Sequence, residues 1–304
     1  MLIEKVFFED FIEFYHAMLP SGTLYPKLHG YIFRGEDSHL YNLLPSVLRP
    51  KNKKRILSMA KLELNQDIET EGKQICIEFL LLKNFYLLSN YHGLRVPSID
   101  EFMFEDQYKL IIDFSKEENW RWIPNKLIEL AALAQHYGVP TRLLDWTFDF
   151  HIALYFASLG ACKNEFEGNN GSGYFVIWAL NRNFLLNYKK HDLNFIVPAY
   201  SDNPNICAQK GILTYWSVSR KDATLSNFSV NLKPLDKLLS DSIEDGVANI
   251  LYKIHINLKK AREAFIFLNR IGYSASRIFP GYAGVTREME EKKYIYAPGG
   301  LVLG

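Results

Sequence analysis

The stretch "QHYGVPTRLLDWTFDFHIALYFAS", residues 135–158, places a cluster of polar residues directly before a strongly apolar run. Its first half holds Gln135, His136, Arg142 and Asp145, and its second half predicts a buried helix. Polar side chains that lead into a buried helix form either the floor of a functional site or a hydrogen-bonded structural corner. The residues of this stretch alone leave both interpretations open.

The segment Asp145-Trp146-Thr147 is expected to start the helix predicted over residues 148–161. Thr147 or Asp145 can serve as its N-cap, and Asp149 falls in the first turn. A capping role would be a sufficient structural explanation for Asp145. His136 is likewise either a hydrogen-bonded turn histidine or a general base.

The apolar pattern on both sides of this stretch divides the chain into a mainly helical first half and a strand-rich second half. One short strand, "GYIFRG" (30–35), interrupts the helical half. The other elements expected are helices over 2–18, 53–71, 74–91 and 125–138, a segment near 99–117, strands over 174–180, 194–200, 211–219 and 249–256, and helices over 259–272 and 284–296.

The later strands need a pairing partner, and "GYIFRG" is the earlier strand that this pattern offers. We therefore predict one α+β domain, with a helical N-terminal half packed on a small mixed β core. Its expected parts are an N-terminal helix within 1–28, a core over 29–288 and a tail over 289–304.

Composition favours a reduced, cytoplasmic protein. The chain has 304 residues and a formal net charge of +1, so no strong overall field attracts nucleic acid or anionic lipid. The three cysteines are far apart and lack the spacing of a metal site, and no histidine pair has such spacing either. The pattern predicts neither a bound metal nor a segment that spans a membrane.

Arg34 is the first candidate for chemistry because it lies at the end of the predicted strand and is followed by Gly35. A guanidinium there, beside a glycine that lets a ligand approach the backbone, suits a phosphate or a carboxylate. The alternative is an arginine paired with a core acid such as Asp145.

Two further signals are weaker. Gln209 precedes a predicted strand in "AQKGILTYW", and its amide could orient a ribose hydroxyl or a nucleophile. The basic run "RPKNKKR" (49–55) is either a solvated face or a phosphate contact. The glycine-rich, Walker and GxSxG motifs of common nucleotide-binding proteins and hydrolases do not occur.

Taken in order, these motifs resemble those of the FRG domain family. The resemblance runs from about residue 29 to 288 and is carried by the tripeptide Phe33-Arg34-Gly35 and by "LLPSVLRP", "LAQHYGVPTRLLDWT", "IALYFAS", "ICAQKGILTYW" and "RIGYSASRIFPGYAGVTR". The family is found mostly in bacteria and their mobile elements, and its layout is similar to that of ADP-ribosyltransferases.

The resemblance implies NAD as a substrate and a cleft whose floor is formed by residues 135–147. Arg34 would contact the pyrophosphate and ribose, Asp145 would lie on a second strand-to-helix step, and Gln209 would take the third catalytic position. The other residues implied in cofactor binding are Gly35, His136, Tyr137, Arg142 and Thr147.

Three hypotheses for function follow. The first is an enzyme that transfers ADP-ribose from NAD to a macromolecular target or hydrolyses NAD, as an effector of defence or toxin type. The second is a module that binds a nucleotide or a phosphorylated partner without turnover. The third is an effector directed to nucleic acid through residues 49–55, and the near-neutral charge of the chain argues against it as the main theme.

Overall fold

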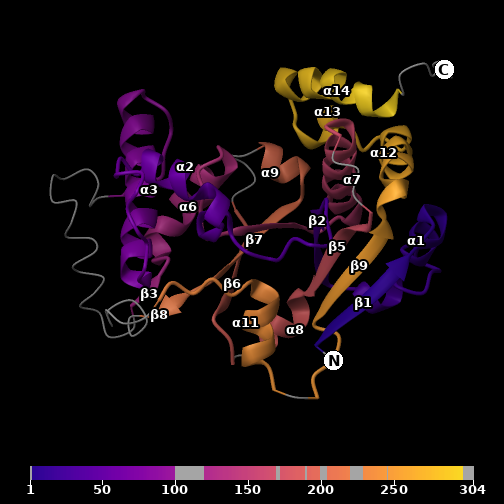
Figure 1. Cartoon of the computed structure of the whole chain (residues 1–304), viewed down its shortest axis with the longest axis horizontal. Coiled ribbons are helices and arrows are strands. Elements are labelled where there is room, and N and C mark those ends of the chain that lie inside the picture. The colour runs from indigo at the N-terminus through magenta and orange to yellow at the C-terminus, as the bar shows by residue number, and fades with distance from the viewer. Residues whose placement is uncertain are drawn as a thin grey trace.

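The computed structural model describes residues 2–99, 120–168, 172–188, 190–198, 204–219, 229–244 and 246–296. These residues form a seven-stranded mixed sheet with helices on both faces and a group of helices beside one end (Figure 1). The predicted α+β class is confirmed. The predicted segment near 99–117 lies, apart from Ile99, outside the described residues.

The large sheet has the strand order β1-β9-β5-β2-β4-β7-β6. Strand β1 runs parallel to β9, and each other neighbouring pair is antiparallel. Strands β3 and β8 form a separate small sheet. The strands are β1 (Ile3–Phe8), β2 (Tyr31–Glu36), β3 (Arg121–Trp122), β4 (Leu144–Thr147), β5 (Tyr174–Asn181), β6 (Leu193–Ile196), β7 (Gly211–Trp216), β8 (Val218–Ser219) and β9 (Leu251–Asn257).

Three groups of helices surround this sheet, as Figure 1 shows. Helices α7 and α12 cover one face, α8 and α11 lie on the other, and α2, α3 and α6 form the group beside β7. The helices are α1 (Phe11–Ala17), α2 (Lys53–Met59), α3 (Glu71–Tyr91), α6 (Asn125–His136), α7 (Phe150–Phe166), α8 (Arg182–Asn187), α9 (Pro204–Ala208), α11 (Leu235–Ser242), α12 (Ala261–Arg270), α13 (Ala275–Ile278) and α14 (Tyr282–Ile295).

Strand β5 explains why both faces of the sheet are covered. Phe175 and Ile177 pack on the α7 side, whereas Val176 and Trp178 pack on the α8 and α11 side. A strand that is buried on both faces needs a continuous apolar run rather than an alternating one, and "YFVIWAL" is such a run.

The N-terminal segment differs from the single helix predicted over 2–18. Residues Ile3–Phe8 form β1, which pairs with the outer side of β9, and the helix begins only after Asp10. The Asp10 side chain caps it by accepting a hydrogen bond of 2.8 Å from the Ile12 amide. The segment 1–28 is therefore not a helix placed before the core, because its strand belongs to the main sheet.

The segment Leu144–Thr147 is a strand and not the start of a helix. It forms four register pairs with β7, and the N-cap of α7 is Asp149, whose Oδ1 accepts from the His151 amide at 3.0 Å. Pairing with β7 explains the difference, because a strand of four residues gains its stability from its neighbours rather than from its own pattern.

Most other expected elements are confirmed with changed bounds. The helix predicted over 53–71 ends at Met59, and the strand predicted over 211–219 divides into β7 and β8. Helix α6 ends before Gly138, which has a φ of +85°, as a glycine stop predicts. At the C-terminal end, α14 continues to Ile295, so the first residues of the expected tail 289–304 are helical.

Candidate functional site

The large sheet divides beside Arg34. Strands β2 and β4 share one register pair, Phe33 with Thr147, whereas β2 forms six such pairs with β5. Because β2 and β4 are antiparallel, the end of β2 and the start of β4 lie at the same edge and separate there. We call this unpaired stretch, between residues 34–36 of β2 and 144–145 of β4, the split.

The Arg34 guanidinium crosses the split and joins its two sides. On the β2 side, its Nε donates to Glu36 Oε1 at 2.8 Å, and its Nη2 lies 2.7 Å from the same oxygen. On the β4 side, Nη1 donates to the backbone carbonyl of Asp145 at 2.9 Å. Burial would lower the pKa of Arg34, but the carboxylates of Glu36 and Asp145 more than offset it and raise the pKa.

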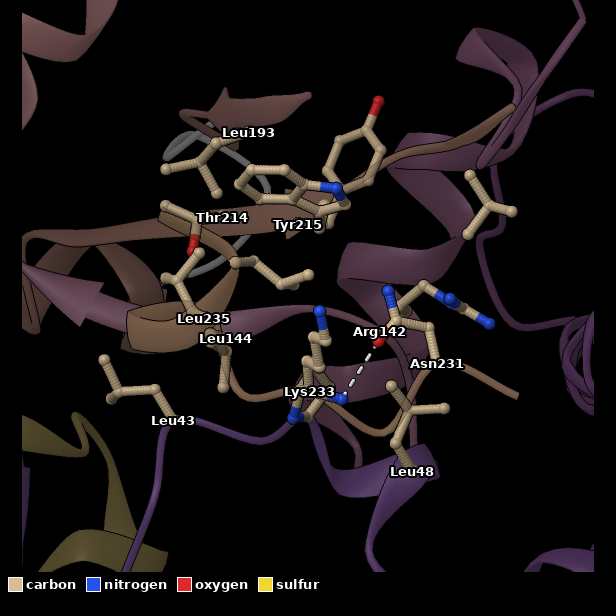
Figure 2. A pocket seen from close by; sticks show the side chains of 14 residues that line it. Leu43, Leu48, Arg142, Leu144, Leu193, Thr214, Tyr215, Asn231, Lys233 and Leu235 are labelled. Carbon is tan, nitrogen blue, oxygen red and sulfur yellow. Dashed lines mark hydrogen bonds between the residues drawn. The ribbon is translucent and has the colours of Figure 1, made fainter. Parts of the chain in front are cut away.

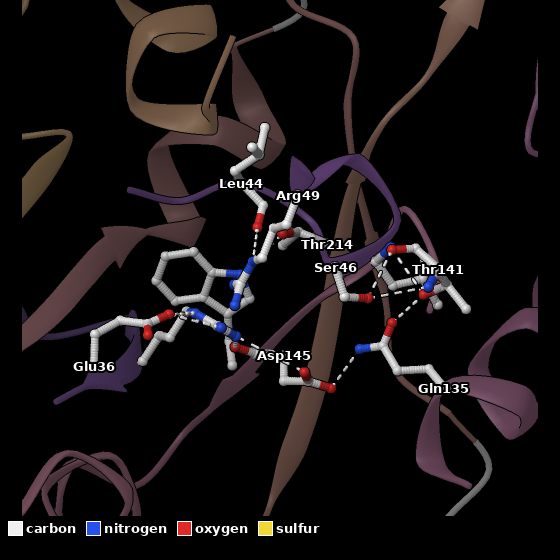
Figure 3. Close-up of polar contacts among 11 residues, drawn as sticks. Glu36, Leu44, Ser46, Arg49, Gln135, Thr141, Asp145 and Thr214 are labelled. Carbon is white, nitrogen blue, oxygen red and sulfur yellow. Dashed lines mark hydrogen bonds and ion pairs between the residues drawn. The ribbon is translucent and has the colours of Figure 1, made fainter. Parts of the chain in front are cut away.

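Asp145 is an exposed carboxylate in the middle of a sheet. Its side chain is 68% exposed although β4 has neighbours on both sides, and its Oδ2 lies 3.8 Å from Arg34 Nη1. Gln135 Nε2 donates to its Oδ1 at 2.6 Å, and the Gln135 amide oxygen accepts in turn from Thr141 (Figure 3). The carboxylate is thus held in place while it faces solvent.

His136 and Tyr137 lie at the edge of this carboxylate site. His136 Nε2 is 3.3 Å from the amide nitrogen of Asn205 in α9. Burial lowers the pKa of His136, and the Asp145 carboxylate partly opposes that shift. Tyr137 is 70% exposed and meets the His136 ring edge to face.

Arg142 lies apart from Arg34 and Asp145, in the core of the helical group. Its guanidinium is 5% exposed and donates to Glu78 through Nε and Nη2, at 3.0 and 2.7 Å. Nη2 also lies 2.5 Å from Glu71, and Trp122 donates to Glu78 at 2.6 Å. These contacts leave the guanidinium closed to solvent, although the resemblance implied that it binds a cofactor.

Gly35 and Thr147 have packing partners. A Cβ atom on Gly35 would lie 1.9 Å from the carbonyl oxygen of Ala153 in α7, so the close approach that this glycine allows is that of a helix. The expectation that it lets a ligand reach the backbone is corrected accordingly. Thr147 is buried, and its hydroxyl donates to the carbonyl of Gln209 at 2.7 Å.

The Gln209 side chain is engaged elsewhere. Its Nε2 donates to the carbonyl of Ile278, in α13, at 3.4 Å. Of the three residues predicted to be catalytic, the structure joins Arg34 and Asp145 by direct contact, and it connects Gln209 to β4 through Thr147 alone.

A second polar cluster surrounds Asp149, which the sequence had suggested only as a first-turn residue. Asp149 Oδ2 accepts from Lys210 and Tyr273, each at 2.9 Å, and Oδ1 lies 3.1 Å from His151 Nδ1. Burial would raise the pKa of Asp149, but these hydrogen bonds hold it well below its usual range. Burial and the bond to Asp149 raise the pKa of Tyr273 to about 12. The cluster fixes the start of α7.

A comparison with known families matches residues 29–165 to the FRG domain. The chain contains an FRG domain. The matched residues run from just before β2 to the end of α7, so they include both sides of the split. Gln209 lies beyond them, and the predicted extension to residue 288 stays a prediction. Searches of curated proteins and of solved structures found no match.

Two of the cavities that adjoin the FRG domain lie near the helical group α2, α3 and α6 or the strands beside it. One, of about 40 Å³, is lined by leucines together with polar and charged residues that include Arg142 and Lys233, and is shown in Figure 2. It is far smaller than the roughly 300–1,000 Å³ of typical ligand sites. The other, of about 1070 Å³, lies between α3, α6 and β6 and includes Tyr137 and Ile206 in its wall. Those two residues follow His136 and Asn205, so this larger cavity begins next to the Asp145 site.

Glu36 completes the site beside Arg34, although the sequence did not single it out. Glu36 could have been found, because it lies two residues after Arg34 on a strand and so faces the same side. Gln135 was a candidate from the sequence, but its hydrogen bond to Asp145 depends on tertiary structure and could not be predicted. In the basic run 49–55, Lys53 pairs with Asp67, and Arg55 donates to the Gly138 carbonyl, so part of this run is engaged within the protein.

Within the described ranges, no group of three or more histidine, cysteine, aspartate or glutamate side chains is arranged to hold a metal ion. Among these residues there is also no helix with the length and apolar character needed to cross a membrane.

Proposed function

We propose that the split beside Asp145 binds NAD and that the protein breaks the bond between nicotinamide and ribose. The ADP-ribosyl group then passes to a macromolecule or to water. The observation that carries this proposal is the Asp145 carboxylate. It is exposed on an inner strand, oriented by Gln135 and adjacent to the Arg34 guanidinium.

The chemistry of this bond suits such a carboxylate. When the bond breaks, its electron pair leaves with nicotinamide, and positive charge develops on the ribose carbon and ring oxygen. A fixed carboxylate stabilises that charge without having to reorganise. The oxygen of water or of a target side chain then bonds to the ribose carbon, and its proton goes to Asp145 or to neutral His136.

Arg34 takes a positioning role in this scheme. Its hydrogen bonds to Glu36 and to the Asp145 carbonyl hold β2 and β4 at a fixed separation. The Glu36 carboxylate already neutralises the charge of Arg34. We therefore assign to Arg34 the orientation of the Asp145 carboxylate rather than the binding of an anion. Holding reacting groups in place contributes strongly to rate enhancement.

The test measures the release of nicotinamide from NAD by chromatography, with the purified wild-type protein and with the Asp145→Asn variant. We expect release by the wild type and a reduction of about 100-fold or more in kcat for the variant, in the range found when one stabilising group is removed. Glu129→Gln, in the wall of the larger cavity, serves as a control that removes a carboxylate elsewhere. The proposal would be contradicted if the wild type neither released nicotinamide nor bound NAD saturably.

A role as an effector of defence or toxin type adds a cellular test. Consumption of NAD would slow the growth of a bacterial host that expresses the protein, and Asp145→Asn would relieve this effect at equal expression. Equal toxicity of both forms would separate the effector role from the Asp145 site.

Binding without turnover is the second candidate, and one observation favours it. Glu36 is committed to Arg34, and the amide of Gln209 donates to Ile278, so neither is free to assist Asp145. Calorimetry distinguishes the two functions. Saturable binding of NAD or ADP-ribose with no product formed would support a nucleotide-binding module.

A further inference from the structure

Arg49 lies on a short turn that holds it against the split. Its Nε donates to the carbonyl of Leu44 at 2.8 Å. The turn itself is attached to the segment just before β4, because the Val47 amide donates to the Thr141 carbonyl at 3.2 Å and the Ser46 hydroxyl contacts the same residue. Figure 3 shows the Arg49 side chain pointing from the turn toward Glu36 and Asp145.

The terminal nitrogens of Arg49 have no bonded partner in the part of the chain that the structure describes. The hydrogen bond to Leu44 uses Nε, and neither Nη1 nor Nη2 makes a hydrogen bond or ion pair there. The side chain is half-buried. Burial and the nearby charge of Arg34 lower the pKa of Arg49, while Glu36, Asp145 and Tyr41 act in the opposite direction.

Arg34 and Arg49 therefore differ in what they can offer a ligand. Glu36 neutralises Arg34 with two contacts through a single oxygen, whereas the nearest carboxylates act on Arg49 only through space. Two guanidinium groups close together repel each other, and an anion placed between them removes that repulsion. The free edge of a guanidinium matches two oxygens of a phosphate group.

We propose that Arg49 is the main anion contact of the split and binds the diphosphate of a nucleotide, with Arg34 behind it. This inference rests on the proposed function for its ligand, and it assigns to Arg49 the diphosphate contact that the resemblance had implied for Arg34. Asp145 is directed away, toward Gln135, so a diphosphate on the Arg49 side leaves the carboxylate for the ribose.

Binding of inorganic pyrophosphate, measured by calorimetry, tests the anion site without requiring turnover. Arg49→Gln should weaken pyrophosphate binding by about tenfold or more, the loss expected for a charge-assisted hydrogen bond. The glutamine amide can still donate to the Leu44 carbonyl, which preserves the turn. Arg49→Lys keeps the charge but loses the planar fork, so its affinity should fall between those of the wild type and Arg49→Gln.

Lys54→Gln is the matched control, because Lys54 is exposed, lies in the same basic run and carries the same charge. We expect its affinity to stay within about twofold of the wild type, since an exposed surface charge is screened by salt. Thermal unfolding of each variant verifies that the fold is intact. Equal effects of Arg49→Gln and Lys54→Gln, or no pyrophosphate binding by the wild type, would overturn the inference.

The two proposals fail in different ways. Pyrophosphate binding that depends on Arg49, without nicotinamide release, would support the anion site and reject the enzyme. Nicotinamide release with the same KM for NAD in the wild type and Arg49→Gln would support the enzyme and reject the anion site. If both hold, Arg49→Gln raises KM and leaves kcat nearly unchanged, because it removes binding common to the substrate and the transition state.

Discussion

The two arginine clusters of this protein are built from the same chemical groups but have opposite surroundings. Arg142 pairs with Glu71 and Glu78, and all three side chains are at most 5% exposed. Arg34 pairs with Glu36 and reaches Asp145, whose side chain is 68% exposed. Arg142 and Asp145 are three residues apart in "TRLLD", yet the Arg142 side chain is buried in the core and the Asp145 side chain is exposed to solvent.

The difference shows that a charged pair indicates function through its surroundings rather than through its residue types. In the Arg142 cluster, the guanidinium contacts both carboxylates, and Trp122, Gln74 and the Asn231 amide donate further hydrogen bonds to them. In the Arg34 cluster, one carboxylate keeps its contact with solvent. A closed cluster should therefore respond to substitution mainly through stability, and an open one mainly through binding and catalysis.

The largest effect on stability is expected from Arg142→Met. Removing one partner of a buried ion pair leaves uncompensated charge, in this case on Glu71 and Glu78, at a cost of about 3–5 kcal/mol. Urea unfolding measures this loss. The double variant Arg142→Met with Glu78→Met should recover part of it. A loss under about 1 kcal/mol for the single variant would show that the cluster is not closed.

Gly35→Ala tests the opposite face of the strand that carries Arg34. The added methyl group would meet the backbone of α7, and overpacking of this kind costs about 1–3 kcal/mol. Thermal unfolding measures the effect. If the stability were unchanged while NAD binding was lost, Gly35 would face a ligand instead of the helix.

Asp145→Asn should change the free energy of unfolding by less than about 0.5 kcal/mol, as is usual for exposed positions. The amide can still accept a hydrogen bond from Gln135. The same urea experiment applied to this variant and to Arg142→Met gives the direct contrast between the open and the closed cluster. A loss as large as that of Arg142→Met would make Asp145 a structural residue.

The smallest effect concerns the titration of His136, measured by NMR. Burial lowers its pKa and the Asp145 carboxylate raises it, so Asp145→Asn should lower the pKa further. The folded protein binds this proton less tightly than the unfolded chain does. Stability is therefore lost as pH falls from the unfolded pKa of about 6.5 toward the folded value, and the variant extends this loss to lower pH. An unchanged pKa would place Asp145 too far from His136 to act on it.

Sequence patterns were sufficient to predict the elements that have one clear period. The strand around Arg34 and the glycine stop of α6 follow from local residues, and the apolar run of β5 indicated a strand, whose burial on both faces is seen only in the structure. Strand β1 was missed because "VFFEDFIEFY" fits the period of a helix as well as that of a strand. Strand β4 has four residues, too few for a period to be seen.

The site was predicted in part for a similar reason. Arg34 and Asp145 were candidates because their local sequence is distinctive, and the structure brings them together. The core acid that pairs with Arg34, however, is Glu36 and not Asp145. The partners of Arg142 lie 64 and 71 residues earlier in the chain, so no local pattern could indicate that its guanidinium is closed. The position of Arg49 depends likewise on how a turn packs against another segment.

The parallel pairing of β1 with β9 has a consequence for the order in which the protein can be completed during synthesis. Residues Ile3–Phe8 leave the ribosome long before their partner, which begins at Leu251. Until β9 has emerged, β1 has no neighbouring strand in the sheet, and the edge of β5 that β9 later covers stays unpaired. Contacts over such long sequence distances form slowly and leave strand edges exposed meanwhile. If synthesis pauses before residue 251, the chain already contains β2 and β4, which border the split. The edge of β5 that later pairs with β9 is still unpaired at that stage.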